Sequence, residues 1–199
     1  MKRPRILMLS LTLLVLGCTT ATEKRYFQLY IPPPETIPDR VIVSGTVRVN
    51  PANVDRVYEG YRLVYRLSPY ELDFYNYVYW VKKPSRMISE LLSDYLRERN
   101  VFSRVLHQTE SIEPDWVLES HVYALEECDR SDARYARLSM LLRLVNRSDN
   151  HVLAEHRFDR MNRLNRQDSR LLPGILSLIL KSELDQLVEK LKPQNPASS

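Results

Sequence analysis

Residues 71–96 have the sequence ELDFYNYVYWVKKPSRMISELLSDYL, in which the spacing of the apolar side chains changes halfway along. Alternation of apolar and polar residues, typical of a strand with one buried face, comes first. After Pro84 the apolar residues recur at intervals of three and four, the spacing of an amphipathic helix. Proline suits the first position of a helix because its φ is already fixed there. The stretch therefore predicts a strand over 71–81 and a helix from Pro84.

The flanking segments add further strands and one more helix. The strand at 71–81 follows another at 61–67 after a Ser-Pro turn, and the two are expected to form a hairpin. Asn100 is expected to end the first helix in a left-handed conformation. A second apolar stripe begins near Asp168 or Ser169 and predicts a C-terminal helix. Period-2 or β-prone runs predict the remaining strands at 26–31, 41–49, 101–106, 115–126, 135–146 and from Val152.

These elements predict an α+β fold. Because strand faces alternate, one sheet face is solvated or used for binding, and two one-sided helices cover the other. We expect a two-layer sandwich with a mostly antiparallel sheet of about eight strands and two amphipathic helices on one face. The length suits a single domain, placed at 26–192, with a flexible tail at 193–199.

The N-terminal residues resemble an export signal. Basic residues precede an apolar run over 6–16 that is shorter than the roughly 20 residues needed to cross a bilayer. The run ends in Val15-Leu16-Gly17-Cys18, which resembles the lipobox of bacterial lipoproteins. This resemblance implies cleavage of residues 1–17, diacylglycerol on the sulfur of Cys18 and a third acyl chain on its amine. Residues 18–25 would then be the lipidated anchor and a short spacer, and no other cofactor is expected.

The residue after the cysteine bears on location. In lipoproteins of enteric type, Asp at that position resembles an inner-membrane retention signal. Thr19 stands there instead and points to the periplasmic leaflet of the outer membrane. Two or more acyl chains anchor a protein stably, so the resemblance implies a permanent tether.

Composition excludes several classes of function. The formal charge of +4 falls to near +1 when Lys2, Arg3 and Arg5 leave with the signal, so nucleic acid is not an expected partner. The four glycines are scattered, which excludes a phosphate-binding loop and a dinucleotide fingerprint. If Cys18 is lipidated, Cys128 is the remaining thiol and no internal disulfide forms. The acidic residues around Cys128 are expected to raise its pKa and reduce its reactivity.

No catalytic motif stands out, and the chain is not expected to be an enzyme. The Gly-x-Ser-x-Gly elbow and His-Glu-x-x-His are both missing from the sequence. His121 and His151 could meet across neighbouring strands, but a metal site there would need an added carboxylate, so separate strand histidines and no metal site are expected. Four carboxylates near residue 128 lack the spacing of a calcium loop and are expected to form a solvated turn: Glu126, Glu127, Asp129 and Asp132.

Tyrosines are the unusual feature of this chain. Seven of the twelve lie between residues 58 and 79. Tyr75, Tyr77 and Tyr79 are spaced by two and are expected to share one strand face. Tyrosine offers a large rigid contact area with a polar tip, so these three are candidates for partner binding. The alternative is that they cover the second face of the sheet against a neighbouring loop or the N-terminal strand.

The order of these features resembles the ABC-type transport auxiliary lipoprotein family. The resemblance rests on the lipobox, Tyr26-Phe27-Gln28-Leu29, the valine strand at 41–49, Tyr77-Val78-Tyr79-Trp80 before the helix at Pro84, and Phe102-Ser103-Arg104-Val105-Leu106. It implies a non-enzymatic accessory protein whose partners are an MCE-domain protein and the components of an ABC transporter that moves lipid. The membrane is reached through the lipid anchor.

Two other functions remain open. The helices and sheet could enclose an acyl chain, which would make the chain a carrier or assembly protein for lipid or lipopolysaccharide. An envelope hydrolase with an unrecognised site is the other alternative, and His121 or His156 would then be required for turnover.

The lipobox gives a direct test. Replacing Cys18 with alanine is expected to abolish incorporation of radioactive palmitate, because the thioether and the cleavage both need that cysteine. The variant retains Cys128, so it still contains one thiol. Labelling at the wild-type level in Cys18→Ala would contradict the lipid anchor.

Overall fold

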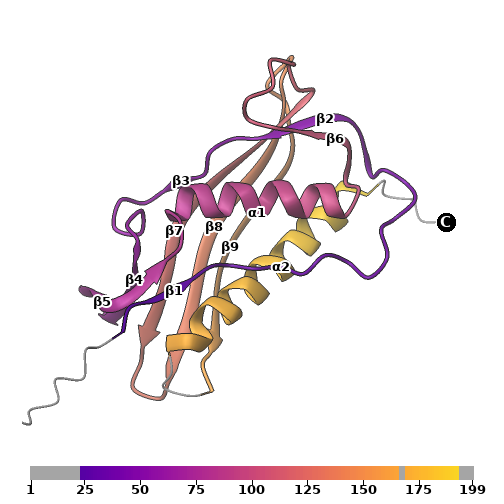
Figure 1. The fold of residues 1–199 in the computed structure, drawn as a ribbon. Helices are drawn as coiled ribbons and strands as arrows, with labels where there is room; N and C mark the ends of the chain where they lie inside the picture. Colours follow the sequence, from indigo (N-terminus) through magenta and orange to yellow (C-terminus); the bar gives the residue numbers. More distant parts are fainter. Residues whose placement is uncertain (1–22, 166–168, 193–199) are drawn as a thin grey trace, which may run out of the picture.

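The computed structural model describes residues 23–165 and 169–192, which form one sheet covered by two helices (Figure 1). The predicted fold class is confirmed, with nine strands instead of about eight. The signal, the cysteine of the anchor and the C-terminal tail lie outside the described residues. The elements are β1 (Arg25–Phe27), β2 (Val43–Val49), β3 (Asn53–Val54), β4 (Arg62–Ser68), β5 (Glu71–Trp80), α1 (Pro84–Glu98), β6 (Phe102–Leu106), β7 (Trp116–Asp129), β8 (Arg134–Asn146), β9 (Val152–Arg163), the 3-10 turn Ser169–Leu171 and α2 (Leu172–Leu191).

The sheet is organised around β7. One edge of β7 pairs antiparallel with β8 along its whole length, and β8 pairs antiparallel with β9. The other edge of β7 pairs in succession with β2, β3 and β4, and each of these pairings is parallel. The long ladders are therefore antiparallel as expected, while the short strands make the sheet mixed. The two-residue β3 lies where the sequence suggested only a connection.

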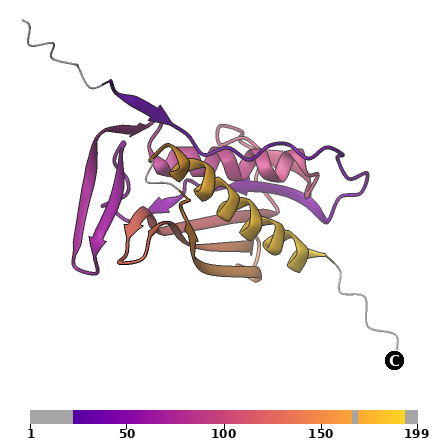
Figure 2. The ribbon, with the colours of Figure 1, turned by 90° about the horizontal axis from the view of Figure 1, so that it is seen from below.

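Both helices lie on the same side of the sheet (Figure 2). Their apolar stripes are buried: Met87, Ile88, Leu92, Tyr95 and Leu96 in α1, and Leu172, Leu176, Ile179, Leu180, Leu184 and Leu187 in α2. The chain after β1 runs across this helical layer, where the backbone N–H of Tyr30 donates to Ser177 Oγ at 3.0 Å. Asn100 follows α1 with φ of 51°, which confirms the left-handed stop.

The two ends of the sheet differ. β1, β4 and β5 lie at one end, where the described chain begins, and the β8–β9 turn lies at the other (Figure 1). β1 joins the sheet through β5 alone, in parallel register. The end at which the described chain begins is therefore built from three strands that extend the sheet beyond the helical layer.

Gly45 occupies an irregular position in β2. The register with β6 shifts between Val43 and Thr46, and Gly45 has φ of 102°. A Cβ at Gly45 would lie 2.8 Å from Oδ2 of Asp115. That same oxygen accepts hydrogen bonds from the backbone N–H and the hydroxyl of Thr46 at 2.7 and 2.8 Å. A side chain at this position would therefore strain the backbone and displace Asp115.

Gly45→Ala is expected to lower the free energy of unfolding by about 1–3 kcal/mol in urea titration, since alanine rarely adopts this φ. Gly174→Ala is the matched control: in α2, nothing lies within 4 Å of its added Cβ. There alanine should raise stability by about 0.5 kcal/mol, because glycine disfavours helix. Equal effects of the two substitutions would refute this account of Gly45.

Candidate functional site

The β4–β5 hairpin stands apart from the helices at one end of the molecule (Figure 2). Its turn exposes Tyr70 almost completely, at 99%, and Leu67 next to the turn is 43% exposed. We call residues 67–70 the hairpin tip. An exposed apolar tip of this kind on a two-stranded support is available for contact with another molecule.

The two strands of the hairpin do not pair in simple register. Val64 lies opposite Phe74, but Arg62 lies opposite Tyr79, so β5 has extra residues between these pairs. Such a bulge changes the directions in which nearby side chains point. It explains why strict alternation along 71–81 did not predict the faces of the tyrosines correctly.

Tyr75, Tyr77 and Tyr79 consequently lie in three different surroundings. Tyr75 packs against the core, and its ring centroid lies 4.9 Å from that of Tyr65. Burial, together with the nearby carboxylate of Glu127, raises the pKa of Tyr75. Tyr77 is 46% exposed, and Tyr79 stacks on a tyrosine of β1. The expected single face of three tyrosines is therefore not formed, and Tyr75 supports the hairpin from within.

A second aromatic surface crosses three strands. Tyr26 of β1 lies opposite Tyr79 of β5, and Tyr79 lies opposite Arg62 of β4, so the three side chains share a face. The rings of Tyr26 and Tyr79 are 5.6 Å apart and stacked, and Lys24 Nζ lies 5.8 Å from the Tyr79 ring.

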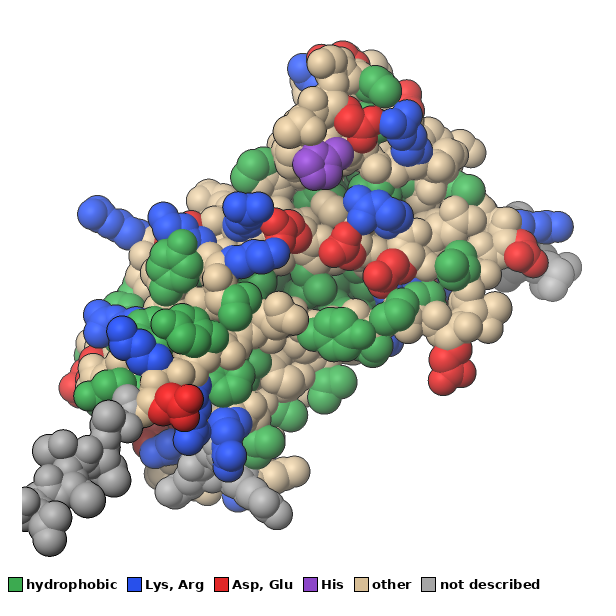
Figure 3. Space-filling view, viewed as in Figure 1, with side chains coloured by type: hydrophobic (Ala, Val, Ile, Leu, Met, Phe, Trp, Pro, Cys, Tyr) green, Lys and Arg blue, Asp and Glu red, His purple; other side chains and the backbone are tan. Residues whose placement is uncertain are grey.

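We call Lys24, Tyr26, Arg62, Tyr77 and Tyr79 the tyrosine face. The neighbouring Val78 and Trp80 point the other way and are buried. Hydrophobic and basic side chains are interspersed at this end of the molecule (Figure 3).

Glu126 joins the hairpin to the body of the sheet. Its side chain is fully buried in β7 and accepts hydrogen bonds from Arg66 Nε at 2.8 Å and from the Tyr58 hydroxyl at 2.6 Å. Arg137 Nη1 donates to the same carboxylate at 3.1 Å and also pairs with Asp159. Burial raises the pKa of Glu126, but the hydrogen bonds from Arg66 and Tyr58 more than offset it, and the pKa is lowered overall. Glu126 is therefore a buried anion held by cations of β4 and β8.

The adjacent Glu127 differs from Glu126 in its hydrogen bonds and in the direction of its pKa shift. Arg134 Nη1 lies 3.2 Å from one of its oxygens, while the other is buried without a hydrogen-bond partner among the described residues. Burial raises the pKa of Glu127 by more than Tyr75 and Arg134 lower it. Neighbouring carboxylates on one strand thus have opposite pKa shifts, because only Glu126 is fully hydrogen-bonded.

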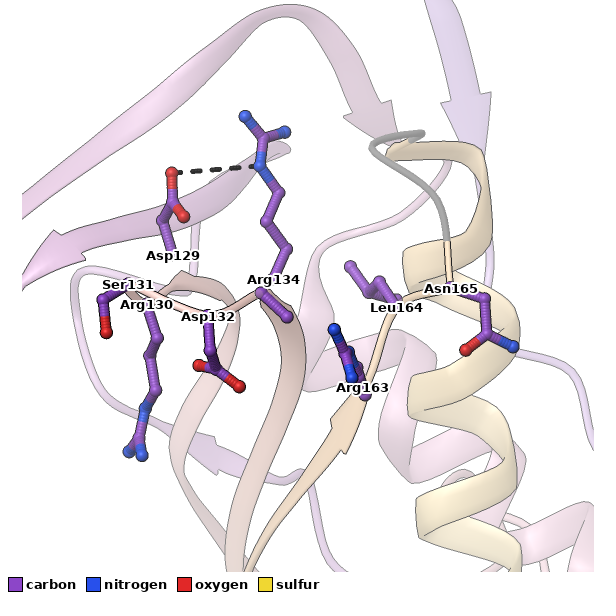
Figure 4. Close-up of a pocket in the computed structure, with 9 residues that line it drawn as sticks. Asp129, Arg130, Ser131, Asp132, Arg134, Arg163, Leu164 and Asn165 are labelled. Atoms are coloured by element: carbon purple, nitrogen blue, oxygen red, sulfur yellow. Dashed lines mark ion pairs between the residues drawn. The ribbon is translucent and has the colours of Figure 1, made fainter.

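The other carboxylates near residue 128 do not gather into a site. Asp129 and Asp132 are exposed, and Asp132 accepts from the Tyr135 hydroxyl at 2.6 Å. They line a hollow of about 490 Å³ at the β7–β8 turn, in which Asp129 faces Arg134 (Figure 4). Within residues 23–165 and 169–192, no group of three or more acidic, histidine or cysteine side chains is arranged to hold a metal ion.

The thiol of Cys128 has the raised pKa that the sequence suggested, but it lies in a different place. Its side chain is buried in β7, not in a turn, and the thiol lies 3.4 Å from Glu126. Burial and the charge of Glu126 raise the pKa of Cys128 to about 12. The expected rise in pKa is confirmed, and a thiol in this state reacts slowly.

The histidines are separated. His121 Nε2 lies 2.8 Å from Asp55 Oδ1 and Nδ1 lies 3.0 Å from Asn53, whereas His151 begins the segment after the β8–β9 turn. His156 is buried between β9 and α2, with Nε2 2.7 Å from Glu183 Oε2 and Nδ1 2.9 Å from Lys190 Nζ. The two histidines considered as a metal pair do not meet, and His156 links a strand to a helix.

Glu126→Gln and Glu127→Gln are expected to differ. Glu126→Gln removes the charge that holds two arginines and should cost about 3 kcal/mol of unfolding free energy at pH 7. Glu127→Gln should change it by less than about 1 kcal/mol, since an incompletely bonded buried carboxylate is removed. Chemical denaturation measures both.

The pH dependence separates the two residues further. The lowered pKa of Glu126 gives stability above its ordinary value of 4.5 that is lost as the pH falls through the folded value. The raised pKa of Glu127 gives stability that is complete below 4.5 and lost as the pH rises. The cost of Glu126→Gln should therefore shrink in acid, and a cost independent of pH would contradict the assignment.

Comparison with known proteins finds solved structures that have a similar fold. None of the curated proteins matches this chain. The crystal structure of protein XCC0632 from Xanthomonas campestris has a TM-score of 0.70 at 18% identity and covers 86% of this chain and 95% of its own. A second crystal structure, of an uncharacterized protein, has a TM-score of 0.66 at 14% identity and covers 85% and 99%. At these identities the likeness shows a shared fold.

Two further findings concern membrane-spanning helices and the protein family. Neither α1 nor α2, the helices of the described residues, is long and apolar enough to cross a bilayer. A family of ABC-type transport auxiliary lipoprotein components matches residues 27–174, from β1 into the start of α2. Because this match spans most of the 199 residues, the chain belongs to the family of ABC-type transport auxiliary lipoprotein components.

Proposed function

We propose that this lipoprotein is a non-enzymatic docking subunit of an ABC transport system that moves lipid. In this proposal the chain is held at the periplasmic leaflet of the outer membrane by the acyl chains on Cys18. Its partner is the MCE-domain protein of the transporter. Membership of the auxiliary lipoprotein family supports the link to an ABC transport system. The observation that carries the docking role is the rigidly supported, exposed hairpin tip.

The hairpin tip is suited to this role because its support is buried and charged. Arg66, next to the tip, donates to Glu126 at 2.8 Å and to the carbonyl of Pro69 at 3.4 Å. Tyr65 donates to Asp73 across the hairpin at 2.8 Å. A tip held in one conformation loses little entropy on binding, which favours affinity. Tyr70 would then act as an aromatic contact residue.

The hollow beside the tip adds polar contacts. It measures about 920 Å³ and is lined by three arginines, by Asp159 and by Leu67, Ser68 and Pro69 of the tip, among others. Apolar and charged side chains therefore lie together beside the tip, which fits a partner segment that has a charged end. We therefore place the MCE-domain partner across the tip and this hollow.

The packing of the interior favours docking over the carriage of lipid. Side chains with at most 5% exposure fill the space between helices and sheet, including Leu92, Leu118, Met140 and Leu180. An acyl chain would need to displace well-packed residues there. The hollows near the hairpin are lined largely by polar and charged side chains.

The test is capture of the lipidated protein from membranes, with a photo-reactive residue in place of Ser68. We expect cross-linked peptides of an MCE-domain protein, or of the permease or ATPase that works with it. Tyr70→Ala should reduce the recovery about tenfold or more, as is typical for an aromatic residue at the centre of an interface. Leu153→Ala, at the opposite end of the sheet with 42% exposure, is the control.

Two results would count against the proposal. A clean capture that recovers no transporter component would remove the docking role. Stoichiometric phospholipid in the purified protein, found by mass spectrometry, would instead support a carrier. Tyr77→Ala and Tyr79→Ala belong in the same experiment, because loss of capture in these variants would extend the partner surface to the tyrosine face.

A further inference from the structure

The tyrosine face and the hairpin tip lie at opposite ends of the β4–β5 hairpin. Arg62 and Tyr79 lie at the open end of the hairpin, and Tyr70 lies at its turn. β4 has seven residues, which corresponds to roughly 23 Å at about 3.3 Å per residue. The two surfaces therefore have room for different ligands.

The length of chain before β1 limits where this face can be. Cys18 precedes Lys24 by six residues, and an extended chain spans at most about 3.5 Å per residue. Lys24 then lies within roughly 21 Å of the acylated cysteine. Acyl chains hold that cysteine at the boundary between hydrocarbon and headgroups, and the headgroup layer itself is about 5–7 Å thick. The tyrosine face is thus restricted to the vicinity of the bilayer.

The chemistry of the face matches a bilayer surface. Tyrosine is enriched at membrane–water interfaces because its ring is apolar and its hydroxyl is polar and forms hydrogen bonds with water. Tyr26 is 60% exposed and Tyr77 is 46% exposed, and Lys24 and Arg62 lie beside them. Basic residues near a membrane are attracted to anionic lipids.

We infer that the tyrosine face lies on the headgroup layer of the bilayer and recognises anionic phospholipid there. This inference rests on the proposed lipid anchor at Cys18. The tether keeps the face at high local concentration, so even weak contacts with lipid are populated. The contact fixes the orientation of the domain on the membrane, which the acyl chains alone leave free.

The charges around the face are favourable overall. Four more basic residues follow on neighbouring segments: Arg25, Lys82, Lys83 and Arg86. Four acidic residues lie here. Asp73 of β5 interacts electrostatically with Arg62, and Glu23 precedes β1. Glu59 accepts hydrogen bonds from Ser85, and Glu90 pairs with Lys82 and Arg86. Positive charge therefore exceeds negative charge at this end, as binding to an anionic surface requires.

The rest of the sheet is carried away from the bilayer in this orientation. β8 has 13 residues and spans roughly 43 Å at about 3.3 Å per residue. The β8–β9 turn lies at the end remote from β1 (Figure 1). Residues near that turn are therefore suitable controls for membrane contact.

The experiment uses the mature, acylated protein in vesicles of phosphatidylethanolamine and phosphatidylglycerol. A nitroxide on Val81→Cys reports on the tyrosine face, and one on Leu153→Cys reports on the remote end. Both positions are similarly exposed, at 43% and 42%. Acylated Cys18 and buried Cys128 do not take the label. We expect label 81, and not label 153, to be shielded from a water-soluble nickel chelate.

Charge variants make the result specific. Lys24→Glu with Arg62→Glu should lower the equilibrium constant for the membrane contact by about 25-fold or more, because each of the two basic residues contributes about fivefold at an anionic surface. Phosphatidylcholine vesicles should weaken the contact in the same way. Arg147→Glu is the control, since Arg147 pairs with Glu113 at the remote end, at 3.6 Å.

Three outcomes would overturn the inference. The first is equal accessibility of labels 81 and 153 on anionic vesicles, and the second is shielding of label 81 that persists in the charge variants. Shielding that needs an added partner protein would make the face a protein interface. Tyr70→Ala separates this inference from the docking role, because it should abolish partner capture and leave label 81 shielded.

Discussion

The attachment of the β4–β5 hairpin depends on the buried carboxylate of Glu126. β4 pairs with β7 over three residues only, from Val64 to Arg66, so the backbone ladder alone is a weak support. Glu126, whose own side chain is fully buried, adds hydrogen bonds from Arg66, Tyr58 and Arg137. Desolvation makes such an anion costly unless it is fully paired. Complete pairing therefore fixes the hairpin in one position, and β1 is fixed with it because it pairs only with β5.

Much of the fold follows from local patterns in the sequence. Alternation and helical spacing predicted the long strands, both helices, the start of the first helix at Pro84 and its stop at Asn100. These features depend on neighbouring residues, so a local pattern suffices. The parallel pairing of β2, β3 and β4 with β7 joins residues about 60–70 positions apart, and no local signal specifies it. Short strands such as β3 also have no local sequence pattern that would predict them.

The candidate surfaces were predicted only in part. Tyrosine enrichment identified the hairpin, but the bulge in β5 separated Tyr75 from Tyr77 and Tyr79, and a bulge shifts alternation without any clear residue signature. The Glu126 cluster was missed because its partners come from distant segments. A signal was present: two adjacent glutamates directly follow the run VYAL at residues 122–125 of β7, and buried charges in such a position require paired cations.

The separation of the hairpin tip from the tyrosine face bears on how an auxiliary lipoprotein could assist transport. A lipid tether by itself confines a domain to a membrane but leaves its rotation free. A second contact near the tether would remove that rotational freedom and fix the direction in which the hairpin tip points. The hairpin links the two surfaces through rigid strands, so orientation at its open end sets the direction of its tip. A partner that spans the space between membranes would then meet the tip in one geometry, which raises effective concentration without stronger contacts.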